Sequence, residues 1–260
     1  MAAPHPIQLR GQPIGCGDFP LIITPLVGRT PADIQAELQA ILPKRPDMLE
    51  WRVDFFKGIA DTAQVIDTAH GIRRSAGSVP LLLTRRHRGE GGQPIAIDEP
   101  AVVALLGAAC EARCVDLIDY ELSNAAADLA HLRAVSAAHG VAMIMSYHNF
   151  QRTPDFDTLL GKFEQAQRLG ADVAKVAVMP QDPQDVLTLL GATQRASQTL
   201  GVPLISMSMG GLGATSRIMG WIYGSAATFA VGKSSSAPGQ IAVEELRSVL
   251  ATVRRAVRGG

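Results

Sequence analysis

Lys175 lies in the middle of an apolar run of Val and Ala that spans residues 173–179. This composition and length are typical of a parallel strand covered on both faces. Burial there disfavours the charged amine and lowers its pKa, and a free amine on a rigid strand is a nucleophile that forms an imine with a carbonyl. Two structural alternatives stay open: the lysine could reach solvent from the strand end, or pair with a buried carboxylate.

His148 is the second candidate, at the end of the preceding apolar run and on the same strand face as Ser146. A lone histidine on an apolar strand is more often a satisfied core residue. The strands that carry His148 and Lys175 are consecutive, however, so the two side chains could meet at one end of a sheet. A neutral imidazole beside a reactive amine can serve as the acid and base of imine chemistry.

Further charged residues share strand faces. Alternate residues of a strand point to the same side, which groups Glu50, Arg52 and Asp54, and likewise Asp119 and Glu121. Charged side chains near the carboxyl ends of barrel strands are where barrel enzymes keep their chemistry. The structural alternative is an ion pair that only fixes one layer of the core.

Three segments outside the strand centres suggest contacts with an anionic ligand. Arg86 leads into the arginine- and glycine-rich segment 85–92, which is typical of an anion-receiving or closing loop. Arg217 lies in the first turn of a helix, where a carboxylate would meet a guanidinium and helix amides. Segment 234–240 is either a solvent loop or a lid that bonds the substrate.

Eight apolar runs alternate with amphipathic stretches along the chain. The expected strands are 21–27, 48–54, 80–86, 115–122, 141–148, 173–179, 203–209 and 226–232. The expected helices include 32–42, 101–113, 125–139, 155–169, 185–200 and 243–257. Repeated strand–helix units with short loops predict parallel strands, and eight units in this length match a (β/α)₈ TIM barrel. The turn after the first strand lacks the glycine fingerprint of a doubly wound sheet.

Residues typical of helix ends support this assignment. Thr30 before Pro31, Asp98 and Asn124 are expected helix N-caps, and Gly140 is an expected C-cap. Residues 7–14 could form a hairpin that closes the barrel bottom. No linker or low-complexity stretch divides the chain, so residues 1–260 are expected to form a single barrel domain.

Composition excludes several classes of function. The 24 basic and 24 acidic residues balance, so no net field recruits nucleic acid or an anionic membrane. No apolar run is long enough to span a bilayer and the N-terminal residues lack a signal core, so a cytoplasmic protein is expected. Cys16, Cys110 and Cys114 cannot all pair, which suits a reducing compartment. Cys110 and Cys114 are spaced as half a metal site, but no second pair matches them.

Taken in order, the motifs resemble those of the type I 3-dehydroquinate dehydratases, from about Leu21 to the last helix. The matching segments are 50–54 (EWRVD), Arg86 with 90–92 (EGG), 144–148 (IMSYH), 175–180 (KVAVMP), 206–209 (SMSM), 216–217 (SR), 224–229 (GSAATF) and 236–240 (SAPGQ). The family fold is a (β/α)₈ barrel, commonly a homodimer, with no metal or organic cofactor.

The resemblance implies a role for each site residue. Lys175 would form a Schiff base, His148 would act as general acid and base, and Glu90 would orient His148. Substrate contacts would come from eight further residues: Glu50, Arg52 and Arg86 at the ring hydroxyls, Arg217 at the carboxylate, Ser236 and Gln240 as the closing lid, and Met207 and Phe229 as the apolar wall.

The predicted function is therefore dehydration of 3-dehydroquinate to 3-dehydroshikimate in the shikimate pathway. One alternative is another imine-forming barrel, an aldolase acting on sugar phosphates, which would bind phosphate near its last two strands. The other is a catalytically silent barrel that binds a polyol acid as a sensor.

Overall fold

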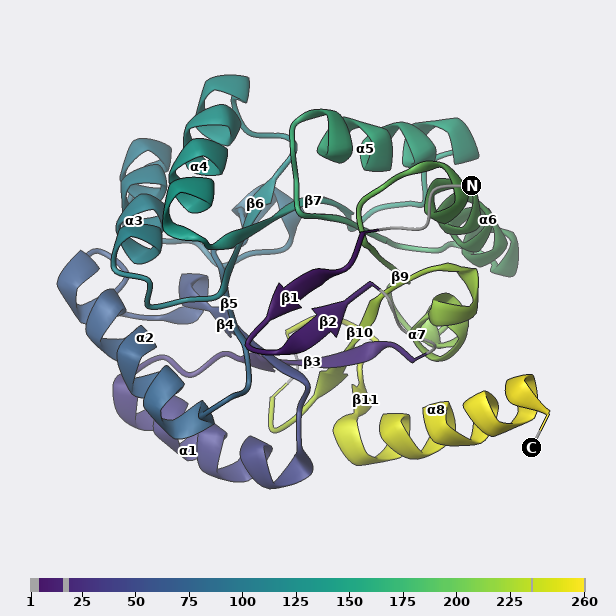
Figure 1. Cartoon of the computed structure of the whole chain (residues 1–260), viewed down its shortest axis with the longest axis horizontal. Helices are drawn as coiled ribbons and strands as arrows, with labels where there is room; N and C mark the ends of the chain where they lie inside the picture. Colours follow the sequence, from purple (N-terminus) through teal and green to yellow (C-terminus); the bar gives the residue numbers. More distant parts are fainter. Residues whose placement is uncertain (1–4, 16–18, 235, 260) are drawn as a thin grey trace.

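The computed structural model describes residues 5–15, 19–234 and 236–259; Cys16 and Ser235 lie outside these ranges. Within them a parallel sheet curls into a ring at the centre of the molecule (Figure 1). Its strands are β3 (Leu21–Leu26), β4 (Met48–Arg52), β5 (Leu81–Thr84), β6 (Leu117–Glu121), β7 (Ala142–Asn149), β8 (Val173–Val178), β9 (Leu204–Ser208), β10 (Ala227–Val231) and the short β11 (Ile241–Ala242).

The ring closes between the last and first barrel strands. β10 pairs in parallel with β3, and β11 continues the sheet beside β10. Between β9 and β10 the join is short: Leu204 bridges Ser225, and the N–H of Ala226 donates to the carbonyl of Leu204 at 2.7 Å. The expected (β/α)₈ barrel is confirmed, since β3 to β10 each follow the chain order around the ring.

Helices surround the ring on its outer side (Figure 1). They are α1 (Pro31–Ile41), α2 (Thr62–Ala76), α3 (Glu99–Glu111), α4 (Ala126–His139), α5 (Phe156–Arg168), α6 (Pro183–Thr199), α7 (Ala214–Met219) and α8 (Val243–Arg258). Four 3₁₀ turns in the described residues complete the elements: η1 (Leu42–Lys44), η2 (Val53–Phe55), η3 (Arg88–Glu90) and η4 (Gly220–Tyr223).

Most of the expected helix ends are confirmed. Thr30 caps α1 by accepting from the N–H of Asp33, and Asp98 caps α3 in the same way. Gly140 ends α4 with a φ of 69°. The expectation that Asn124 caps α4 is wrong: the N-cap residue is Ala125, which makes no side-chain capping bond, and the Asn124 side-chain amide donates to Glu121 at 3.0 Å.

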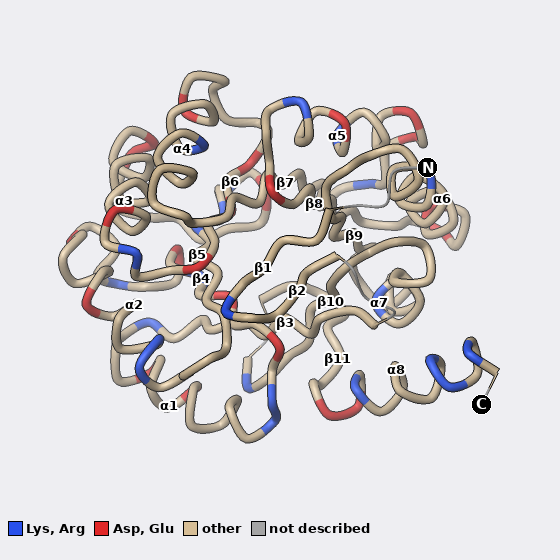
Figure 2. Tube along the Cα trace, in the orientation of Figure 1, with Lys and Arg blue, Asp and Glu red and all other residues tan. Residues whose placement is uncertain are grey.

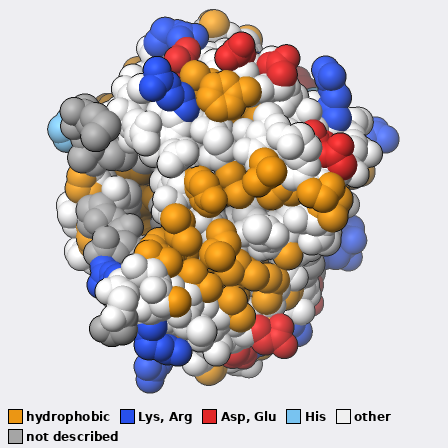
Figure 3. Space-filling view, turned by 90° about the vertical axis from the view of Figure 1, so that its right-hand side faces the viewer, with side chains coloured by type: hydrophobic (Ala, Val, Ile, Leu, Met, Phe, Trp, Pro, Cys, Tyr) orange, Lys and Arg blue, Asp and Glu red, His pale blue; other side chains and the backbone are white. Residues whose placement is uncertain are grey.

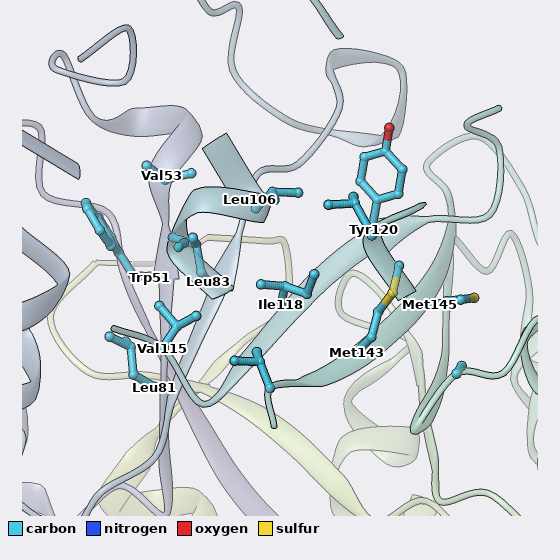
Figure 4. Close-up of a cluster of buried hydrophobic side chains, with 14 of the residues drawn as sticks. Trp51, Val53, Leu81, Leu83, Leu106, Val115, Ile118, Tyr120, Met143 and Met145 are labelled. Carbon is cyan, nitrogen blue, oxygen red and sulfur yellow. The ribbon is translucent and has the colours of Figure 1, made fainter. Parts of the chain in front are cut away.

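The two strand faces build separate cores. Outward-facing apolar side chains pack under the helices, as the alternation in β4 predicts for Leu49 and Trp51. Figure 4 shows part of this cluster, with members from four neighbouring strands and from α3: Trp51, Val53, Leu81, Leu83, Leu106, Val115, Ile118, Tyr120, Met143 and Met145. The inward faces form a second apolar cluster, which extends from Leu9 and Ile14 of the N-terminal hairpin to Met207 and Phe229 at the pocket. The polar residues of the inward faces lie at the carboxyl ends of the strands, beside the upper part of this cluster.

The expected N-terminal hairpin is present. β1 (Ile7–Leu9) and β2 (Gln12–Ile14) pair antiparallel and lie across the centre of the ring (Figure 1). Leu9 and Ile14 are buried in the inward cluster, together with residues from the amino-terminal ends of the barrel strands. The hairpin thus closes the amino-terminal end of the barrel and keeps water out from that side.

Charge is spread evenly over the outside. Figure 2 shows acidic and basic residues interspersed along most helices, in keeping with the balanced composition. Exposed large apolar residues occur on α5 to α8 and their loops, namely Phe156, Leu187, Leu212, Ile222, Val249 and Val257. Figure 3 shows that apolar side chains gather on the face of the molecule that it views. In the described part of the chain, each helix is too short or too polar to cross a membrane.

We expect Ile14→Ala to lower the free energy of unfolding by about 2–4 kcal/mol, because it leaves a cavity in the closed end of the barrel. Gln8→Ala, on the exposed side of the same hairpin, should change it by less than about 0.5 kcal/mol. Chemical denaturation of both variants measures the difference. Equal midpoints would show that the hairpin is not part of the cooperative core.

Candidate active site

A pocket opens at the carboxyl ends of the barrel strands, opposite the hairpin. The residues around it come from almost every strand end: Glu50, Arg52, Arg86, Glu90, Gly91, His148, Phe150, Lys175, Ala177, Met207, Met209, Phe229, Ser236, Ala237 and Gln240. Each residue that the sequence assigned to a site lines this pocket, apart from Arg217. His148 and Lys175, predicted from separate strands, therefore face one space.

Lys175 is buried at the base of the pocket, with 4% of its surface exposed. Its Nζ lies 3.0 Å from Asp119 Oδ2 and 3.8 Å from Glu50 Oε1, and 4.8 Å from the centre of the Phe229 ring. Of the two structural alternatives for this lysine, pairing with a carboxylate is the one realised. The amine is not the unpartnered group of the sequence argument; it is an ion-paired amine that points into a pocket.

Asp119 connects several site residues. Besides Lys175, its carboxylate meets Arg86 Nη2 at 2.8 Å and accepts from the hydroxyl of Ser146 at 2.6 Å. Burial alone would raise the pKa of Asp119, but the positive charges of Arg86 and Lys175, with a smaller effect of His148, hold it well below its usual range. Asp119 is therefore ionised and held from three sides.

His148 is fixed through its other ring nitrogen. Nδ1 lies 3.0 Å from Glu90 Oε2, and the backbone N–H of His148 donates to the same oxygen at 2.9 Å. Ser123 donates to the second oxygen of Glu90 at 2.6 Å. A carboxylate only accepts, so this network assigns the proton to Nδ1 and leaves Nε2 as a free acceptor.

The charge state of His148 suits a base. Burial lowers its pKa well below the ordinary value, and the positive charges of Arg86 and Lys175 lower it further. Burial also raises the pKa of Glu90, although the hydrogen bond from Ser123 acts to lower it. The imidazole is consequently neutral at physiological pH and able to take a proton.

Arg86 is the cation that organises the buried carboxylates. Its Nη1 donates to Glu121 and to Ser146, each at 2.8 Å, in addition to the pair with Asp119. The other arginines of this segment go elsewhere: Arg85 pairs with Glu99 on the outer side of the barrel, and Arg88 is exposed. The predicted anion-receiving cluster is therefore divided, and only Arg86 belongs to the pocket.

Arg52 is held by a two-pronged ion pair with Asp54, at 2.8 Å for both contacts. Asp54 belongs to η2 rather than to the strand, because the chain turns after Arg52. Glu50 accepts from Thr84 at 3.0 Å. Glu50 and Arg52 thus present one acceptor and one donor to the pocket from the same strand face.

Arg217 is a buried cation behind the pocket wall, 1% exposed. Its Nη2 donates to the carbonyl of Pro238 at 3.0 Å and its Nη1 to that of Phe229 at 3.4 Å, while Nε has no partner among the described residues. No carboxylate of the described chain pairs with it, and burial lowers its pKa to about 10. A helix-amide contribution is not supported, since the N–H groups of Ser216 and Arg217 both donate to Gly213.

Segment 236–240 covers the pocket and is not a free solvent loop. The carbonyl of Ser236 accepts from Arg52 at 3.4 Å, and the carbonyl of Pro238 accepts from Arg217 and from the N–H of Gly210. Gly239 adopts a φ of +74°, and a Cβ there would lie 2.2 Å from the oxygen of Gly210. The lid therefore rests on both arginines and on a backbone contact that requires glycine.

Some site residues were not assigned from the sequence. Asp119 and Ser146 were placed on the correct strand faces without a role, and Phe150 and Ala177 had no signal of their own. The spacing of Asp119 from Glu121 is the pattern that could have identified it. Cys110 and Cys114 are both buried, and burial raises their pKa to about 12 and about 11. The described residues contain no group of three or more metal-ligating side chains.

Comparison with known proteins identifies close similarities over the whole chain. The family model described as "Type I 3-dehydroquinase" matches residues 22–256. A 3-dehydroquinate dehydratase from Albidiferax ferrireducens is 54% identical over 260 residues, covering 100% of this chain and 98% of that protein.

Solved structures agree. The 3-dehydroquinate dehydratase of Geobacillus kaustophilus superimposes with a TM-score of 0.95 at 46% identity, covering 97% of each chain. The type I enzyme of Clostridium difficile, crystallised with "Covalent Modified Comenic Acid", superimposes with a TM-score of 0.93 at 36% identity and covers 97% of this chain and 99% of its own.

We expect His148 to titrate below the ordinary histidine value of about 6.5, since burial and two nearby cations disfavour imidazolium. The unfolded chain then binds the proton first, so the stability contributed by His148 is present above that value and is lost as the pH falls through the folded pKa. Ring NMR against pH, assigned with His148→Asn, gives the midpoint. A midpoint at or above the ordinary value would contradict the assignment of a neutral base.

Proposed function

The chain belongs to the type I 3-dehydroquinase family, and we propose that it carries out the family's reaction through an imine on Lys175, with His148 as the acid and base. The family membership makes it a hydro-lyase of the shikimate pathway, which dehydrates 3-dehydroquinate. The observation that carries the proposed mechanism is that a buried amine and a neutral imidazole with a free nitrogen line one pocket.

Substrate binding begins with the carboxylate. Arg217 supplies a buried positive charge without an acidic partner in the described chain, and its present partners are carbonyl oxygens. A carboxylate is a stronger acceptor for a guanidinium than a carbonyl is. Arg217 would therefore bind the substrate carboxylate, and Ser236 and Gln240 of the lid would close over it.

The ring of the substrate would lie between a polar and an apolar side. Glu50, Arg52 and Arg86 are the polar groups of the pocket that would meet its hydroxyls. Met207 and Phe229 form the opposite, apolar wall. This division orients the ring ketone toward Lys175, whose amine lies over the Phe229 ring.

Imine formation needs proton transfers near the amine. Lys175 attacks the ketone, and His148 moves protons so that the carbinolamine loses water and the imine remains protonated. The protonated imine withdraws electrons from the neighbouring carbon, which makes its C–H bond acidic. Nε2 of His148 removes this proton and then donates one to the departing hydroxyl.

Glu90 would keep His148 in place through these steps. Its contacts with Nδ1 and with the backbone N–H fix the ring orientation and the tautomer. After water has left, hydrolysis of the imine releases 3-dehydroshikimate and returns the amine to its resting state.

The family match favours this function over the two alternatives. The relatives are described as dehydratases, which favours dehydration over aldol cleavage and a hydro-lyase over a silent sensor. The covalently modified ligand of the Clostridium difficile enzyme is consistent with covalent chemistry in this family. The homodimer, the single domain, the absence of a cofactor and the cytoplasmic location stay predictions.

Borohydride added to the protein with 3-dehydroquinate should give one irreversible adduct on Lys175. Its mass should equal that of the product less one water plus two hydrogens, as reduction of an imine requires. Intact mass spectrometry and peptide mapping measure this, with Lys175→Arg as the matched control. An active enzyme that is never modified at Lys175 would refute the imine mechanism.

Arg217→Met should separate binding from folding. We expect the KM for 3-dehydroquinate to rise by about 10- to 100-fold, from loss of a charge-assisted contact. Folding stability should be retained or increased, because the removed charge has no acidic partner in the described chain. Arg85→Met is the matched control: it removes an equally buried arginine that pairs with Glu99 outside the pocket. Arg85→Met should lose stability and keep its KM. If Arg217→Met kept its KM instead, Arg217 would not belong to the binding site.

A further inference from the structure

We propose that Asp119 is the counter-ion of the protonated imine, and so a further catalytic residue of this enzyme. The inference rests on the proposed imine at Lys175. Its starting point is contact with the reacting atom, because Asp119 Oδ2 lies 3.0 Å from Lys175 Nζ.

The charge on the Lys175 nitrogen does not change when the imine forms, so one counter-ion can serve both the resting amine and the protonated imine. Condensation of an ammonium with a ketone gives a protonated imine and one water, so the nitrogen carries one positive charge before and after the step. The imine keeps one N–H, and Asp119 lies where that N–H can donate. The carboxylate that pairs with the resting amine can therefore remain its partner through dehydration.

Asp119 is better placed for this role than the other carboxylate at Lys175. Glu50 lies farther from Nζ, at 3.8 Å, and its nearer oxygen already accepts from Thr84. The remaining charged groups that face this region are at the ends of neighbouring elements: Arg52 on β4, Arg86 after β5, Glu90 in η3, Glu121 on β6 and His148 on β7. None of these carboxylates forms an ion pair with Lys175 in the described chain.

The surroundings keep Asp119 anionic. It is fully buried, and Arg86 and Ser146 hold its two oxygens at 2.8 and 2.6 Å. These contacts favour the ionised carboxyl and oppose its protonation. Asp119 would consequently act as a fixed charge, while His148 moves the protons.

A fixed negative charge here has a kinetic consequence. A neutral imine withdraws electrons far less than a protonated one, so loss of the imine proton stops the C–H step. An anion at hydrogen-bond distance raises the pKa of the imine and extends activity to higher pH. Removal of the charge should then affect the alkaline side of the pH profile more than the acidic side.

Asp119→Asn tests this directly. We expect the alkaline limb of kcat against pH to move down by roughly one to three units, the usual effect of one opposite charge at this range. Asp119→Glu, which restores the charge, should recover the position of the limb. Glu121→Gln is the matched control, because Glu121 is equally buried and also pairs with Arg86 at 2.8 Å but not with Lys175. The alkaline limb of Glu121→Gln should stay at the wild-type pH even if the kcat of this variant falls.

The outcomes are separable from those of the proposed function. A wild-type enzyme that borohydride cannot modify at Lys175 removes the imine itself. A wild type that is modified, together with an unshifted limb in Asp119→Asn or the same shift in Glu121→Gln, overturns only the counter-ion. A shift found in Glu50→Gln alone would assign the role to Glu50 instead.

A measurement on the wild-type enzyme covers the case in which Asp119→Asn does not fold. The vibrational C=N band of the imine formed with product moves in heavy water only when its nitrogen carries a proton. We expect this isotope shift to persist at the alkaline end of the stability range. A band without it at neutral pH would overturn the proposal.

Discussion

The ion pair between Asp119 and Lys175 is the contact around which this site is organised. A buried ammonium is stabilised by a nearby anion, and that anion in turn needs Arg86 and Ser146 to stay ionised. Arg86 also contacts Glu121 on β6 and Ser146 on β7, so its orientation is fixed by two strands. Because each charge is held by more than one neighbour, the reactive nitrogen has a defined position before any substrate arrives.

The barrel makes this arrangement possible. Its inward faces are apolar at the lower end and carry the charged residues at the upper end, beside the apolar Met207 and Phe229, and the hairpin of β1 and β2 closes the lower end. Water is therefore excluded from the lower side, while the upper side opens only under the lid at 236–240. In such surroundings electrostatic interactions are stronger than in water. In the proposed mechanism, the fully buried Asp119 would act as a fixed charge and the neutral imidazole of His148 as the base.

Arg217 illustrates the opposite situation. It is buried without a carboxylate partner in the described chain, and it holds the lid only through a carbonyl oxygen. An incompletely compensated cation costs folding energy, which marks it as a group kept for a ligand. Two carbonyls of the lid contact Arg52 and Arg217, so in the proposed function the same two side chains would hold the lid and bind the substrate.

The sequence by itself determined the barrel, the closing hairpin and most of the pocket. Strand parity grouped Glu50 with Arg52 and His148 with Ser146, and Lys175 stood out as a charge within an apolar run, since alternation and repeated strand–helix units are local properties of the chain. Only the tertiary structure decided which charges meet. Asp119 and Lys175 are 56 positions apart, and no local sequence pattern shows that these two residues form an ion pair. The same limit applies to Arg86, whose partner Ser146 is 60 positions away in the sequence.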